Sequence, residues 1–200
     1  MRLILIVSVM LIVAISVIFV ANIFLLPMFY ESTKVSQMSD VYDDVADVCE
    51  NIDLGEAKPD DSTGLYDKLD SLSDNSGVSI YVMQISVSAL GSIANINYVY
   101  PASSDHLKNI TINQLAKYVR AMYFGEELDE NYELLKNSQS YAIYKVYDTR
   151  IGSNYIELTG KLPDNYWLYL RANYTGILDS ALASMMALPA CFAARTANSN

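Results

Sequence analysis

Residues 156–171, with the sequence IELTGKLPDNYWLYLR, decide how the second half of this chain folds. Two runs of apolar, β-branched and aromatic residues flank the triplet Pro163-Asp164-Asn165. Proline suits the first corner of a type I turn and asparagine tolerates a positive φ, so the triplet predicts a hairpin turn with a bulge. We therefore expect antiparallel strands at residues 154–162 and 166–171.

Three further segments have the composition of strands. Residues 141–148 have alternating side chains and directly precede the hairpin, which extends it to a three-strand meander. Residues 78–87 (VSIYVMQISV) are apolar on both faces, as in a buried strand, and residues 95–100 form a second strand closed by Pro101. Together these segments predict a five-stranded, mainly antiparallel sheet.

Two segments with the apolar spacing of helices lie before and between the predicted strands. Residues 111–124 place apolar side chains three and four positions apart, which predicts a helix between the strand pair and the meander. Residues 65–72 show the same spacing over a shorter length. The expected fold class is therefore α+β, with helices flanking the sheet.

The N-terminal part of the chain predicts one long helix. Residues 3–26 are apolar except for Ser8, Ser16 and Asn22, and a helix of this length crosses the roughly 30 Å hydrocarbon core of a bilayer. Apolar positions continue at spacings of three and four from Val35 to Ile52. This seam can pack on its own domain or meet a second copy in a parallel dimer. We favour packing on its own domain, with a homodimer sharing part of the seam.

A cleaved signal peptide is the alternative interpretation of residues 3–26. The hydrophobic region of a signal peptide has about 7–15 residues and ends at a cleavage site of small residues. Residues 3–26 form a longer apolar run, and bulky side chains follow at its end. We therefore interpret it as an uncleaved membrane anchor. Arg2 precedes the run and acidic residues dominate the segment after it, which favours an extracytoplasmic location for residues 28–176.

The C-terminal end predicts a second membrane segment. Residues 181–194 carry no charge but reach Arg195 too soon to span a bilayer. The expected organisation is a membrane helix at 1–27, an extracytoplasmic domain at 28–176, and the truncated start of a second membrane helix at 177–200.

Composition and motifs exclude several functions. The net charge of −10 argues against binding nucleic acid, which requires clustered lysine and arginine. The sequence lacks the spacing of a phosphate loop, a zinc site or a nucleophile elbow. We therefore expect no catalytic residue, no metal site and no cofactor within these 200 residues.

The hairpin segment also carries a resemblance to a known family. It resembles the final hairpin of the PAS-like, Cache-type sensor domains of Firmicutes sensor histidine kinases, whose pattern is L-x-G-x-L-x-[ND]-G-x-x-[IL]-x-L-R. Asn165 stands where that pattern has glycine. The matching positions here are Leu158, Gly160, Leu162, Leu168, Leu170 and Arg171.

The resemblance implies a function in signal transduction. The chain would be the sensing part of a two-component sensor histidine kinase that works as a dimer in the cell membrane, with the kinase domains outside these residues. Two alternatives remain open. One is the sensor of a chemotaxis transducer or a diguanylate cyclase, and the other is an anchored structural or adhesion domain.

A ligand pocket in such a fold would lie over the sheet, beneath the helix that precedes the meander. Its ligand would be a small molecule or a component of the cell envelope. The alternative for each candidate residue is ordinary packing in the sheet. By strand position alone, the candidate ligand-binding residues are Tyr98, Tyr100, Arg120, Tyr144 and Trp167.

Overall fold

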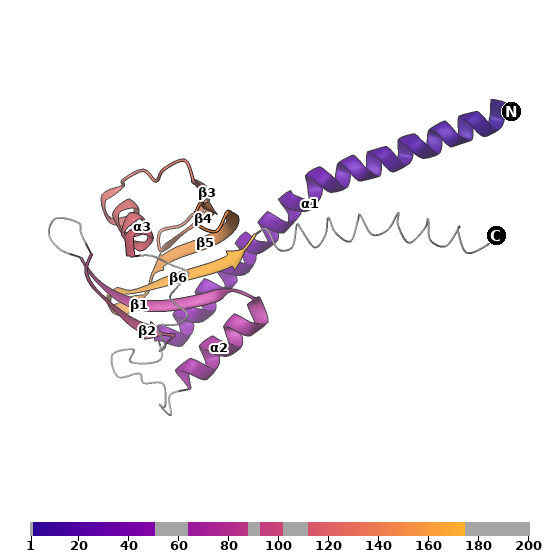
Figure 1. Cartoon of the computed structure of the whole chain (residues 1–200). Helices are drawn as coiled ribbons and strands as arrows, with labels where there is room; N and C mark the ends of the chain where they lie inside the picture. Colours follow the sequence, from indigo (N-terminus) through magenta and orange to yellow (C-terminus); the bar gives the residue numbers. More distant parts are fainter. Residues whose placement is uncertain (1, 51–63, 88–92, 102–111, 175–200) are drawn as a thin grey trace.

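Helix α1 (Arg2–Glu50) projects far beyond the rest of the molecule in the computed structural model, which describes residues 2–50, 64–87, 93–101 and 112–174 (Figure 1). Its 49 residues span roughly 70 Å. Side chains from Ile4 to Val20 are exposed. Among the described residues, α1 is the one helix long and apolar enough to cross a membrane, and a signal sequence would have the same character.

The second half of α1 packs on the domain, as the spacing of its apolar residues predicts. Met38 and Val45 are fully buried, and Tyr42 and Cys49 are nearly so. The seam is thus covered by the chain's own sheet and by helix α2 (Leu65–Ser76). A dimer through α1 stays a prediction. The exposed face of this part of the helix is acidic and includes Asp40, Asp43, Asp44 and Asp47.

One antiparallel sheet forms the centre of the domain. Its order is β2-β1-β6-β5-β4-β3, so the last strand of the chain lies between β1 and β5 and joins the first strand pair to the meander. The strands are β1 (Ser79–Val87), β2 (Ile93–Tyr100), β3 (Tyr132–Asn137), β4 (Tyr141–Asp148), β5 (Ser153–Lys161) and β6 (Tyr166–Asn173).

The prediction of five strands was wrong, because β3 makes a sixth. This strand lies at the edge of the sheet and buries little, and Leu134 is 53% exposed. The pairing of β3 with β4 also shifts register between Leu134 and Lys136. An irregular edge strand lacks the regular polar and apolar alternation on which sequence prediction depends. The five predicted strands are all present, with small differences at their ends. The predicted second membrane segment at 177–200 lies outside the described residues.

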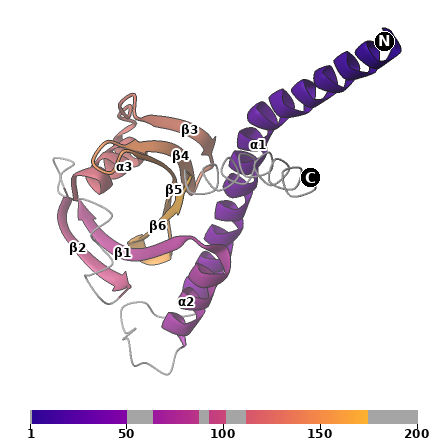
Figure 2. The same cartoon turned by 45° about the vertical axis from the view of Figure 1, so that its right-hand side comes forward.

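Helices cover both faces of the sheet (Figures 1 and 2). Helices α1 and α2 pack on one face, and α3 (Ile112–Phe124) packs on the other. Strand β1 serves both layers, because Ile80 and Val82 belong to the α1 side and Tyr81 and Met83 to the α3 side. This two-sided burial explains why β1 is apolar along its whole length.

The hairpin between β5 and β6 forms where the sequence predicts it, but with a different turn. Asp164 has φ 55° and Asn165 has φ 62°, and the N–H of Tyr166 donates to the carbonyl of Pro163. Two successive positive φ angles are the mark of a type I′ turn, which suits the twist of paired strands. Pro163 therefore precedes the two central residues instead of occupying the first corner of a type I turn.

Gly160 in β5 allows α1 to approach the sheet. A Cβ atom at this position would lie 2.6 Å from Cε2 of Tyr42 and 2.9 Å from Cβ of Tyr141. The Tyr42 hydroxyl donates to the carbonyl of Lys161 at 2.5 Å, which holds the ring over the glycine. The helix therefore docks closely at this point because β5 carries no side chain there.

We expect Gly160→Ala to destabilise the domain by about 1–3 kcal/mol, because the added methyl group must displace a packed ring. The free energy of unfolding can be measured in urea on the full chain in detergent micelles. Trp167, the one tryptophan of the chain, is buried and reports unfolding by its fluorescence.

A Tyr42→Ala background provides the control. Once the ring is absent, Gly160→Ala should cost less, because the contact with Tyr42 is removed and only the one with Cβ of Tyr141 remains. An equal cost in both backgrounds would show that the approach of Tyr42 is not the reason for glycine at this position.

Candidate functional site

The polar groups of the domain interior gather on the face of the sheet that α3 covers. Three adjacent strands each contribute one buried charged residue, which are Asp148 of β4, Glu157 of β5 and Arg171 of β6. Glu157 and Arg171 are direct partners in the β5–β6 ladder. Buried charges are rare unless they are paired, so this group is the clearest candidate for a specific role.

Glu157 is fully buried and joins the sheet to α3. Its carboxylate accepts hydrogen bonds from the Tyr118 hydroxyl and, at 3.1 and 3.2 Å, from the Gln114 side-chain amide. The Nε of Arg171 lies 3.4 Å from Oε1. Burial raises the pKa of Glu157, although its hydrogen bonds and Arg171 act to lower the pKa. Glu157 thus ties helix α3 to the middle of the sheet.

Asp148 holds two arginines. Its Oδ2 accepts from Nη2 of Arg171 at 2.7 Å and from Nη2 of Arg150 at 3.0 Å. Burial alone would raise the pKa of Asp148, but the hydrogen bonds from Arg150 and Arg171 outweigh it and lower the pKa to about 2. The guanidinium of Arg171 also lies over the ring of Tyr155, 3.7 Å from its centroid. The two acids and two arginines together carry no net charge.

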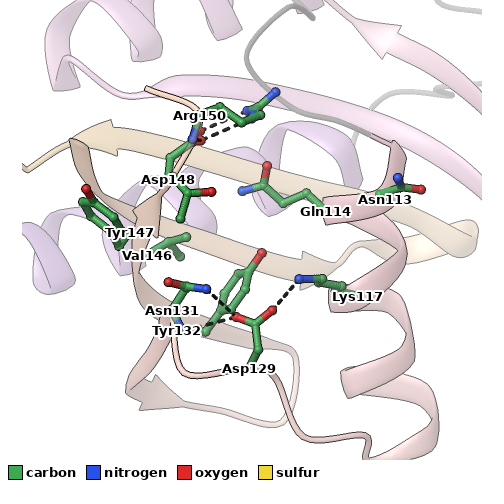
Figure 3. A pocket seen from close by; sticks show the side chains of 11 residues that line it. Asn113, Gln114, Lys117, Asp129, Asn131, Tyr132, Val146, Tyr147, Asp148 and Arg150 are labelled. Atoms are coloured by element: carbon green, nitrogen blue, oxygen red, sulfur yellow. Dashed lines mark hydrogen bonds and ion pairs between the residues drawn. The ribbon is translucent and has the colours of Figure 1, made fainter. Parts of the chain in front are cut away.

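A cleft opens next to this charge network, between the first turns of α3 and the end of β4 (Figure 3). It has a volume of about 160 Å³. Asp148 and Arg150 stand at one end, and the Lys117–Asp129 ion pair, 2.5 Å between Nζ and Oδ2, stands at the other. The lining residues are Asn113, Gln114, Lys117, Asp129, Asn131, Tyr132, Val146, Tyr147, Asp148, Thr149 and Arg150.

The walls of the cleft combine several kinds of polar group. Its walls offer amides, hydroxyls and paired charges, which orient a polar ligand by hydrogen bonds. Across the described parts of the chain, no three His, Cys, Asp or Glu side chains come together as metal ligands.

The five residues predicted from strand position do not form one site. Tyr98, Tyr144 and Trp167 lie on the α3 side of the sheet in its apolar cluster, where Trp167 is 2% exposed. Tyr100 lies on the opposite side, and its hydroxyl donates to Asp70 of α2. Arg120 is exposed on α3, 3.7 Å from Glu126. None of the five lines the cleft described above, so their role in binding stays a prediction.

Sequence reasoning missed the residues that do line or back the cleft. Asp148 is the last residue of β4 and Arg150 lies in the turn that follows, while Glu157 and Arg171 interrupt otherwise apolar stretches of β5 and β6. The signal was available in the hairpin, because a three-residue loop at 163–165 places Glu157 opposite Arg171. The contacts of Gln114 and Tyr118 in α3 with Glu157 have no such local signal, because they join residues 43 and 39 positions apart.

Comparison with known protein families, curated proteins and solved structures finds no match to this chain.

We expect Arg171→Ala to destabilise the domain by about 3–5 kcal/mol, because it leaves two buried carboxylates without their shared partner. Urea denaturation followed by Trp167 fluorescence measures the loss. Arg120→Ala is the matched control. Its ion pair is exposed, so the loss there should stay below about 1 kcal/mol. Similar losses in the two variants would contradict a structural role for the buried network.

Acid should destabilise the domain through Asp148. As pH falls, the unfolded chain takes up the proton near the ordinary pKa of 3.8, whereas the folded chain takes it up only near pH 2. The stabilisation, about 2 kcal/mol, is therefore complete above about pH 5 and is lost between about pH 4 and pH 2. Glu157 acts in the opposite direction, because its raised pKa makes protonation favour the folded chain.

The Asp148→Asn variant tests this assignment. It should be less stable than the wild type at neutral pH, because Arg150 and Arg171 lose an ionised partner. Its stability should fall less between pH 4 and pH 2 in a series of urea titrations. An unchanged slope over that range would assign the acid sensitivity to other carboxylates.

Proposed function

We propose that this chain is the signal-sensing and membrane-anchoring part of a two-component sensor histidine kinase. Residues 28–176 would form a PAS-like, Cache-type sensor domain on the extracytoplasmic side of the cell membrane. The observation that carries the proposal is that one strand, β6, connects the charge network behind the cleft to the helix that bears the apolar N-terminal segment. The kinase chemistry would belong to other domains of the parent protein.

Two positions of the family-like pattern have specific physical roles in this fold. Gly160 makes room for Tyr42 and so lets α1 dock on the sheet. Arg171 joins Asp148 to Glu157 behind the cleft. Gly160 thus contributes to the docking of α1, and Arg171 contributes to the structure of the candidate site. This agreement between the pattern and the packing supports the proposed family.

The route from the cleft to the helix is short. Arg150 lines the cleft and shares Asp148 with Arg171 of β6. Two residues further along that strand, the carbonyl of Asn173 accepts a hydrogen bond of 3.1 Å from the Tyr30 hydroxyl of α1. A ligand that contacts Arg150 or Asp148 therefore acts on groups linked to α1 through a single strand.

A junction of side chains secures α1 where it meets the end of β6. The ring of Tyr30 lies 5.7 Å from that of Tyr174, measured between centroids. Nζ of Lys145 lies 2.8 Å from Oε2 of Glu31 and 4.7 Å from the Tyr174 ring centroid. We call the group Tyr30, Glu31, Lys145, Asn173 and Tyr174 the helix junction. Its contacts combine hydrogen bonding, charge and ring packing, so a small shift of β6 changes several of them together.

Signalling requires two arrangements of α1 relative to β6. A ligand favours one of them only if it binds that arrangement more tightly. We place the difference at the helix junction, because Tyr30, Glu31 and Lys145 are half-buried and Asn173 is exposed, so the bonds between their side chains and backbone can rearrange while the buried Tyr174 ring stays in the core. The relay then needs no unfolding of the domain.

A chimeric receptor tests the proposal. Residues 1–176 are joined to the second membrane span and kinase domains of a histidine kinase that has a transcriptional reporter. We expect kinase output that changes at least twofold when Tyr30→Phe removes the hydrogen bond to Asn173. Glu31→Gln should also change the output, because it weakens the pair with Lys145.

Glu127→Gln is the matched control for Glu31→Gln, because this glutamate is exposed and belongs neither to the helix junction nor to the lining of the cleft. It should leave the output unchanged. Location is checked separately on the full chain, with Ser36→Cys in a Cys191→Ser background, which a membrane-impermeant maleimide should label in intact cells. The native Cys49 is buried and its pKa is raised to about 12 by burial, so it should not react. Labelling only after lysis, or an output insensitive to both junction variants, would contradict the proposal.

A further inference from the structure

The size of the cleft restricts its ligand to a small molecule. Its volume is about 160 Å³. Pockets for larger organic ligands usually measure about 300–1,000 Å³. The cleft therefore fits a single small ring or a short chain.

The charges of the cleft cancel within its own walls. Lys117 is paired with Asp129 at one end, and Arg150 with Asp148 at the other. Behind the wall, Arg171 contributes a second partner to Asp148. Each charged group of the lining is already paired, so a ligand with a net charge would have to open one of these ion pairs to gain a partner. The cleft therefore favours a ligand of zero net charge.

Neutral polar side chains also line the cleft. Those of Asn113, Asn131 and Thr149 can donate and accept hydrogen bonds, and the Asn131 amide already donates to Oδ1 of Asp129 at 3.2 Å. The Tyr132 hydroxyl points into the cleft, as Figure 3 shows. The hydroxyl groups of a polyol also donate and accept, so they can bind these groups and the outer edges of the paired charges. Neither ion pair has to open for such a ligand to bind.

Apolar surface is also present, but it is limited. Val146 and the ring of Tyr132 contribute the apolar part of the lining. A fully apolar ligand would bury the amides and charges without hydrogen bonds, at a substantial free-energy cost. A ring with hydroxyls at its edge and C–H groups on its faces satisfies both kinds of surface.

We infer that the cleft between α3 and β4 binds a small, uncharged, polyhydroxylated molecule of about the size of one sugar ring. This inference rests on the proposed function, because it names the ligand class of the proposed sensor domain. The two ion pairs orient the ligand from its ends, and the amides contact its middle.

The test uses the full chain in micelles of a detergent without a sugar head group. The probes are N-acetyl-D-glucosamine and D-glucose as neutral polyols, glycine as a zwitterion, and succinate and putrescine as charged molecules. Ligand-observed NMR titration measures each dissociation constant. We expect at least one polyol to bind with a dissociation constant of about a millimolar or tighter, as a ligand of this size permits. The other three probes should bind at least tenfold more weakly.

Asn113→Ala and Asn131→Ala should each weaken polyol binding about fivefold, because each removes a neutral hydrogen-bonding group. Asn113 is exposed and Asn131 is half-buried, so neither substitution should unfold the domain. Unchanged fluorescence of the buried Trp167 verifies that each variant is folded. Asn75→Ala is the matched control. It removes an exposed asparagine from α2, on the opposite side of the sheet, and should leave binding unchanged.

Two outcomes would overturn the inference. Tighter binding of glycine, succinate or putrescine than of either polyol would assign the cleft to a zwitterionic or charged ligand. Polyol binding that neither asparagine variant weakens would place the ligand elsewhere. In both cases the proposed sensor function is judged separately, by the response of the chimeric receptor to the junction variants. If the kinase output does not respond to the junction variants while the polyol still binds, the proposed sensor function is overturned and the proposed binding site is retained.

Discussion

Arg171 sits at the interaction on which the rest of the domain depends. It is 4% exposed, and its guanidinium lies between the carboxylates of Asp148 and Glu157. A buried cation of this kind persists only where anions and hydrogen bonds surround it. Strands β4, β5 and β6 must therefore stay in one register, because a slip of one residue would turn the charges to the α1 side of the sheet. The charge network therefore fixes the register of these three strands as well as stabilising the sheet.

The same network couples the three layers of the domain. Glu157 binds Gln114 and Tyr118 of α3, so the helix that walls the cleft is attached to the central strands by polar contacts as well as by its apolar side. On the other face, Gly160 admits Tyr42 of α1 three residues further along β5. Strand β5 thus contacts α3 through the carboxylate of Glu157, and α1 packs closely on it at Gly160, where there is no side chain. This arrangement places a polar cleft and a membrane-type helix on opposite faces of one sheet.

Much of the secondary structure follows from local pattern. Strand β4 begins and ends where the alternation of residues 141–148 predicts, and the apolar seam of α1 is buried as its spacing predicts. Edge strand β3 escaped prediction because a bulge and a shallow position remove the alternation. The hairpin turn was predicted at the right residues, but Asp164 also takes a positive φ, which local preferences did not anticipate. The ligand-binding role of the five candidate residues stays a prediction, because four of them are aromatic residues packed on the two sides of the sheet and Arg120 is exposed on α3, and none lines the cleft.

The sequence by itself determined the elements that repeat a short pattern. These are the apolar N-terminal helix, its buried seam, and the strands of the meander, since each depends on residues only a few positions apart. Tertiary structure alone decided which polar residues meet. Gln114 reaches Glu157 across 43 positions of sequence, and Tyr30 reaches Asn173 across 143. Such contacts depend on strand order and on the docking of helices, which are set by the packing of the whole chain.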